Sequence, residues 1–175
     1  MSTEQGESME NITTKEYQKL AARTLTDDHL RSYTGQEMMI VIDALGLCGE
    51  VGELLDSAPS YRAVEVGDVM WYAAALYTNI GAIMPNPNLN VCGSEMSIAL
   101  AVSSARFADA AKKMVFHDHG LNLDKLADYL DEFCDDLWGY CRAHGIDPRQ
   151  AMAGNIDKLK ARYPNGFDTQ KSINR

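Results

Sequence analysis

Two pairs of carboxylates lie on either side of a short linker. Glu50 and Glu53 are three residues apart, and so are Glu65 and Asp68. Residues at this spacing share one face of a helix. Because the linker around Pro59 is short, we expect the two helices to fold back as an antiparallel hairpin that brings the four carboxylates to one place.

Four oxygen ligands at one point are typical of a hard divalent cation. They favour Mg²⁺, with Mn²⁺ as an alternative, over zinc. Asp68 falls in one stripe with Val64 and Trp71 on a segment that is apolar nearly all round, so we expect burial there and core packing for Trp71. A buried carboxylate must be neutralised, paired or bound to a cation, and Arg62 is the nearest cationic candidate in the sequence. Acids at helical spacing also occur on ordinary solvated faces, which is the competing interpretation.

Glycines interrupt the helical pattern around the acids. Each costs about 1 kcal/mol relative to alanine inside a helix. This penalty indicates close helix approach or ligand access. The positions concerned are Gly46, Gly49, Gly52 and Gly67.

Apolar periodicity and capping signals predict an all-α chain without strands. The expected helices cover about residues 15–25, 34–56, 61–80, 94–115, 124–144 and 148–163. Asp147 is the expected cap of the last helix, with Pro148 at its first position. Residues 81–93 contain two prolines and three asparagines and read as a loop. We expect a disordered tail over 1–12 and one domain over 13–170.

An internal repeat relates two parts of this domain. Copy one covers about 37–80 and copy two about 94–145. Copy two keeps the second acid pair, as Glu132 and Asp135, but has Ser103 and Arg106 in place of Glu50 and Glu53. Half of the ligands are gone and a cation occupies one position. We therefore expect copy two to bind no metal and to complete a four-helix core.

The last predicted helix carries a polar stripe. Asn155, Lys158 and Arg162 fall within about 60° of one another at helical spacing. One amide and two cations suit a polyphosphate. Basic residues are also favoured near any helix C-terminus by the helix dipole, which is the ordinary explanation. Next to an acidic metal site, the stripe would be the complementary half of one active site.

Composition narrows the function classes. The chain has 175 residues and a net charge of −9, which argues against binding duplex nucleic acid through its phosphates. No apolar run is long enough to span a membrane, and no signal peptide is evident. The four cysteines show no Cys-x-x-Cys spacing, which is typical of reduced thiols in a cytoplasmic protein.

Taken together, the acid motifs resemble the signature of the all-α nucleoside triphosphate pyrophosphatases, which include the MazG-like proteins and the dimeric dUTPases. Residues 16–21, 44–53 and 67–72 resemble the first helices of small bacterial and phage members. Residues 155–167 resemble their Asn-x-x-Lys-Leu-x-x-Arg-Tyr-Pro closing segment. Two departures are Gly49, where many members have a further Glu, and the extra helix pair before the closing segment. Trypanosomatid-type dUTPases also carry a degenerate second copy.

The resemblance implies Mg²⁺-dependent cleavage of a (d)NTP between its α- and β-phosphates, giving (d)NMP and pyrophosphate. Related proteins form dimers or tetramers; because the internal repeat could replace one such interface, we expect a homodimer, with a monomer as the alternative. The resemblance also implies that Glu50 or Glu53 acts as the base. The implied metal ligands are Glu50, Glu53, Glu65 and Asp68. The implied nucleotide contacts are Asn155, Lys158, Arg162 and Tyr163. Tyr72 and Trp71 are the candidate base-stacking groups, with core packing favoured for Trp71. Two alternatives stay open: a house-cleaning enzyme specific for dUTP or dCTP, and a helical interaction module without metal.

Overall fold

The computed structural model describes residues 32–90, 96–117 and 119–164. The chain divides between Ser32 and Tyr33 into two units, and the description below concerns the second, Tyr33–Arg175. The predicted tail over 1–12 and the predicted helix over 15–25 lie outside the described residues.

Every regular element in the described part of the chain is an α-helix, which confirms the predicted all-α class. The helices are α2 (Gly35–Asp56), α3 (Arg62–Ile80), α4 (Met96–Phe116), α5 (Leu123–Ala143) and α6 (Pro148–Arg162). Each boundary lies within two residues of the predicted one. Residues 81–90 form neither helix nor strand, as expected for the described part of the loop.

Local sequence signals define the helix ends. Thr34 caps α2 through a capping box: its hydroxyl accepts from the Glu37 N–H at 3.1 Å, and its own N–H donates to the Glu37 carboxylate at 2.7 Å. Gly81 ends α3 in the left-handed conformation, with φ of 73°. Asp147 caps α6 as predicted, accepting from the Arg149 N–H at 2.9 Å.

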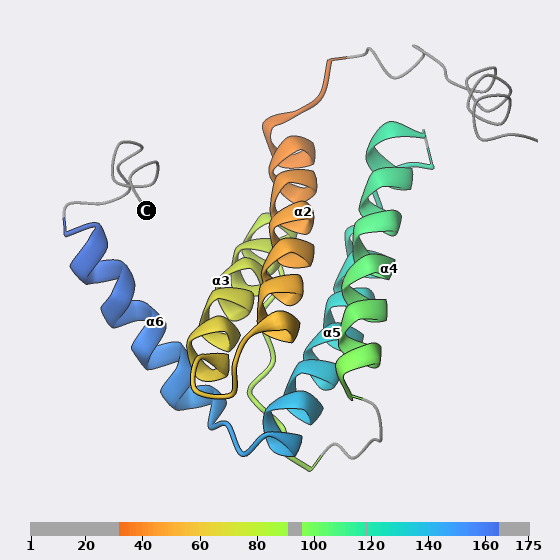
Figure 1. The fold of residues 1–175 in the computed structure, drawn as a ribbon. Coiled ribbons are helices and arrows are strands. Elements are labelled where there is room, and N and C mark those ends of the chain that lie inside the picture. The colour runs from red at the N-terminus through yellow and green to blue at the C-terminus, as the bar shows by residue number, and fades with distance from the viewer. Residues whose placement is uncertain (1–31, 91–95, 118, 165–175) are drawn as a thin grey trace, which may run out of the picture. The chain divides into compact units, whose positions relative to one another are not determined.

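Helices α2 to α5 form a four-helix core (Figure 1). α2 packs against α3 and α4, and α5 packs against α4 and α3. Asn79, late in α3, donates to Asp43, early in α2, so this hairpin is antiparallel. Helix α6 lies against α3, outside the four-helix core.

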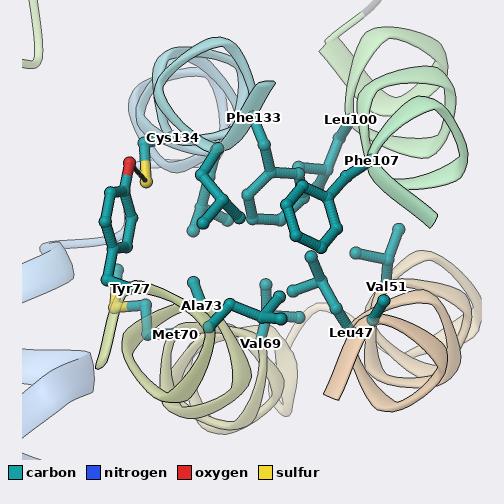
Figure 2. Packing of buried hydrophobic residues seen from close by; sticks show 14 of the residues in the cluster. Leu47, Val51, Val69, Met70, Ala73, Tyr77, Leu100, Phe107, Phe133 and Cys134 are labelled. Carbon is teal, nitrogen blue, oxygen red and sulfur yellow. Dashed lines mark hydrogen bonds between the residues drawn. The ribbon is translucent and has the colours of Figure 1, made fainter. Parts of the chain in front are cut away.

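Apolar side chains from all four core helices meet in the interior (Figure 2). Leu47 of α2, Val69 of α3, Phe107 of α4 and Phe133 of α5 are each 0% exposed. Packing in this core holds α2 and α3 against each other, and these two helices carry the acid pairs. None of the described helices combines the length and the apolar character needed to cross a membrane.

The expectation that Trp71 packs in the core is wrong. Trp71 is 45% exposed and Val64 is 48% exposed, whereas Trp138 of the second hairpin is 1% exposed. The core face of α3 is the one that carries Val69, and the stripe with Asp68 lies on another side. Because α3 is apolar nearly all round, periodicity alone could not identify its core face.

Candidate functional site

Three of the four predicted acids come together across the α2–α3 hairpin. Glu50 of α2 and Glu65 and Asp68 of α3 each offer one carboxylate oxygen, and these oxygens all lie within 4.8 Å of one another. All three residues are partly buried, whereas Glu53 is exposed and lies outside the set. We call Glu50, Glu65 and Asp68 the acid cluster; Glu53 stands at its rim.

The acid cluster has an excess of negative charge. The pKa of Glu65 is raised, first by burial and then by the carboxylates of Asp68 and Glu53, while Lys158 lowers it. A cation placed among these groups would relieve their mutual repulsion. The donor set consists only of carboxylate oxygens, which fits a hard ion such as Mg²⁺ or Mn²⁺.

Helix α6 supplies the partners of Asp68. The ammonium group of Lys158 contacts both carboxylate oxygens of Asp68. The side-chain amide of Asn155 donates to one of them at 2.7 Å. Two members of the predicted polar stripe therefore meet the predicted metal ligands directly, through one aspartate.

The candidate partner Arg62 does not pair with Asp68. Its guanidinium lies 3.0 Å from Nδ1 of His144 instead. Arg62 begins α3, more than one turn before Asp68, and there it faces the end of α5. Proximity in sequence favoured Arg62, but the fold places Lys158, ninety residues further along the chain, on Asp68.

Two of the four glycines allow close helix approach. A Cβ atom on Gly67 would lie 2.9 Å from Cβ of Asn155 and 3.0 Å from the carbonyl oxygen of Ala151, so α6 contacts α3 beside Asp68. A Cβ on Gly46 would lie 2.1 Å from the ring of Tyr72.

Tyr72 lies between α2 and α3. Its side chain is partly buried, and its ring packs against α2 at Gly46. The ring of Trp71 contacts it edge-on at a centroid distance of 4.8 Å. This position gives Tyr72 a packing role beside the acid cluster. Its proposed stacking on a base stays a prediction.

The remaining stripe residues lie at the C-terminal end of α6. Arg162 is the last helical residue, one turn beyond Lys158, and is partly buried. Tyr163 caps the helix, and its N–H donates to the carbonyl of Leu159 at 2.8 Å. The predicted contacts of Arg162 and Tyr163 with phosphates stay predictions.

The second hairpin has a different arrangement at the corresponding place. Arg106 of α4 forms a 2.6 Å ion pair with Glu132 of α5. Ser103 is buried, and its hydrogen bond lowers the pKa of Asp136, which burial raises more strongly. The acid that interacts with Ser103 is thus Asp136. Asp135, which the internal repeat matches to Asp68, is exposed. Elsewhere in the described ranges, no His, Cys, Asp and Glu side chains converge as the acid cluster does.

Comparison with protein-family models, curated proteins and solved structures finds no match to this chain.

Proposed function

We propose that the chain is a Mg²⁺-dependent nucleoside triphosphate pyrophosphohydrolase of the MazG-like type, cleaving a (d)NTP to (d)NMP and pyrophosphate. The observation that supports this most is the position of Asp68. It belongs to the acid cluster and at the same time accepts from Lys158 and Asn155 on the cationic stripe of α6. Groups suited to a cation and groups suited to phosphates therefore share one site.

Each group has a distinct task in this proposal. Glu50, Glu65 and Asp68 would hold Mg²⁺. The bound ion would supply positive charge to the substrate phosphates. Glu53, outside the acid cluster but close enough to act on Glu65, is then the better of the two candidate bases, because Glu50 is committed to the cation.

The reaction is a hydrolysis. A water oxygen forms a bond to the α-phosphorus, the bond from that phosphorus to the bridging oxygen breaks, and pyrophosphate leaves. Glu53 accepts the proton of the water. Lys158, moved from Asp68 to the phosphates, offsets the charge on the departing pyrophosphate, and Arg162 lies one turn further along the same stripe.

A non-catalytic helical module is the second candidate, and one observation favours it. Lys158 already neutralises Asp68, so the site does not require a metal in order to be paired. This candidate predicts that Mg²⁺ leaves the melting temperature unchanged, whereas a metal-binding enzyme should be stabilised by Mg²⁺ with a nucleotide analogue. A dUTP- or dCTP-specific enzyme would use the same acids and differ in its base pocket.

We also propose that the protein is a cytoplasmic homodimer. Met38, Ile42 and Leu45 recur on one face of α2 at helical spacing and are 37%, 52% and 66% exposed. Exposed apolar stripes of this kind mark contact surfaces. The occupant we favour is α2 of a second copy, related by a twofold axis. The described cysteines are all free thiols, in keeping with a reducing compartment.

The activity is tested by incubating the purified protein with each NTP and dNTP plus Mg²⁺ and measuring released pyrophosphate and monophosphate. We expect equimolar products from at least one nucleotide, loss of activity on chelation, and loss of activity in Glu53→Gln with an unchanged melting temperature. Folded wild-type protein that releases no pyrophosphate from any nucleotide would refute the proposal.

A further inference from the structure

A groove of about 550 Å³ adjoins the acid cluster. It lies between the α2–α3 linker with the start of α3, the α5–α6 connection, and one side of α6 from Gln150 to Lys158. Asn155 and Lys158 line it, and these residues also contact Asp68. The groove and the acid cluster therefore share a wall, and one extended ligand could occupy both.

The walls of this groove suit an organic ring better than a phosphate. Ala63, Val64 and Ile146 give it apolar surface, and Val64 is 48% exposed. Its polar side chains away from the acid cluster are His144, Asp147 and Gln150, and Asp147 already accepts from the Arg149 N–H as the cap of α6. Apolar walls with a small number of polar groups are typical of small-molecule sites.

The polar groups offer both donors and acceptors. Arg62 donates to Nδ1 of His144, so a neutral His144 carries its proton on Nε2 and is a donor there. Burial, followed by the charge of Arg62, lowers the pKa of His144, which favours this neutral form. Gln150, on the α6 wall, adds an amide that can donate and accept at once. Such a set can match the polar edge of a nucleobase.

We infer that this groove binds the nucleoside part of the substrate, with the base against Val64 and Ile146 and within reach of Gln150 and His144. The phosphates then run past Lys158 to the acid cluster. The inference rests on the proposed function and deepens it, because it locates the base-recognising part of the site. It also gives the exposed apolar surface at the start of α3 a role.

Gly154 allows a direct test. It lines the groove, lies inside α6, and a Cβ placed on it would meet no atom within 4 Å. Gly154→Leu should therefore fill the groove without disturbing the fold, and leucine favours a helix over glycine by about 1 kcal/mol. Ala153→Leu is the matched control, because Ala153 is the exposed neighbour and does not line the groove.

The measurement is calorimetric titration, in Mg²⁺, of two ligands: α,β-imido nucleoside triphosphates, which resist cleavage, and inorganic tripolyphosphate. In Gly154→Leu we expect the Kd of the nucleotide analogue to rise at least tenfold and that of tripolyphosphate to stay unchanged. Ala153→Leu should leave both values unchanged. Equal losses for both ligands, or no loss for either, would overturn the inference.

The same titration separates this inference from the proposed reaction. If Gly154→Leu selectively weakens binding of the analogue but the wild-type protein releases no pyrophosphate, the groove inference stands and the hydrolase proposal is refuted. Turnover of nucleotides with an unchanged KM in Gly154→Leu would retain the hydrolase and overturn the groove. Wild-type protein that neither binds the analogue nor releases pyrophosphate would overturn both.

Discussion

Lys158 of α6 and Asp68 of α3 form an ion pair in which the ammonium group contacts both oxygens of the carboxylate. The two side chains are 31% and 24% exposed. A divalent cation in the acid cluster would need one of these two oxygens. Lys158 and a cation would therefore compete for Asp68. In the proposed reaction this competition ends when Lys158 moves to a substrate phosphate.

Lys158→Met should affect metal binding and turnover in opposite directions. Removing the competing ammonium should lower the Kd of Mn²⁺, measured without nucleotide by paramagnetic resonance, several-fold. Removing a cation that stabilises the departing pyrophosphate should lower kcat by roughly 10²-fold. Lys160→Met is the matched control, because Lys160 is exposed on the same helix and should change neither quantity. Weaker Mn²⁺ binding in Lys158→Met would contradict the competition.

Glu65→Gln should raise the stability of the metal-free protein and weaken its binding of Mn²⁺. Burial and two neighbouring carboxylates oppose ionisation of Glu65, so neutralising it should raise Tm in the absence of divalent ions. Loss of a ligand should raise the Kd of Mn²⁺ at least tenfold, or about 1.4 kcal/mol. Parallel thermal melts with and without Mn²⁺ measure both effects.

Glu132→Gln is the corresponding change in the second hairpin. It removes the exposed pair with Arg106, which is worth less than about 1 kcal/mol. It should leave Mn²⁺ binding unchanged. Equal losses of Mn²⁺ affinity in Glu65→Gln and Glu132→Gln would mean that the acid cluster is not the metal site.

Asp43→Asn should flatten the pH dependence of stability. Asp43 is 4% exposed, accepts from Asn79 at 2.6 Å, and burial raises its pKa above the ordinary 3.8. Between 3.8 and the raised value the folded state binds more protons than the unfolded state. The free energy of unfolding contributed by Asp43 therefore falls as pH rises through that interval and stays low at neutral pH. The variant should melt a few degrees higher at pH 7, with no gain below pH 3.8. An identical gain at both pH values would contradict this account.

The sequence predicted the helices well because their signals are local. Thr34, Asp147 and Pro148 define helix starts through caps that involve neighbouring residues. The three-residue spacing within each acid pair, together with the short linker at Pro59, predicted that all four carboxylates would meet. Glu50, Glu65 and Asp68 do, whereas Glu53 is exposed and stays outside the acid cluster.

Features that depend on helix orientation could not be predicted in the same way. The core face of α3 depends on which neighbours cover it, and Trp71 was therefore misplaced. The pairing of Lys158 with Asp68 depends on where α6 lies after two intervening helices. The polar stripe of α6 predicted that its cations would lie near the acids, but not which acid Lys158 would contact. Gly67 marks the place of that contact, since a side chain there would collide with α6.

Leu45→Glu should dissociate the proposed homodimer. Leu45 is 66% exposed on the apolar face of α2, and a twofold contact would place two introduced carboxylates close together. Sedimentation should show that the variant is a monomer. Its circular dichroism spectrum should show that the monomer is still folded. Ala105→Glu, an exposed change on α4, is the control that should leave the assembly intact. A wild-type protein that is already monomeric at tens of micromolar would contradict the dimer.

Gly67→Ala should separate α6 from α3 and reduce activity through positioning. The added methyl group would lie 3.0 Å from the carbonyl oxygen of Ala151, a backbone atom that cannot rotate away, so α6 must shift. Overpacking of this kind costs about 1–3 kcal/mol. The shift should draw Asn155 and Lys158 off Asp68, lowering kcat while the Kd of bare Mn²⁺ stays the same or falls. Gly154→Ala is the stability control: it adds the same methyl group to α6 at a position with open space. Its free energy of unfolding should be unchanged or slightly raised. Full activity in Gly67→Ala, at unchanged stability, would show that close contact between α3 and α6 is not needed for catalysis.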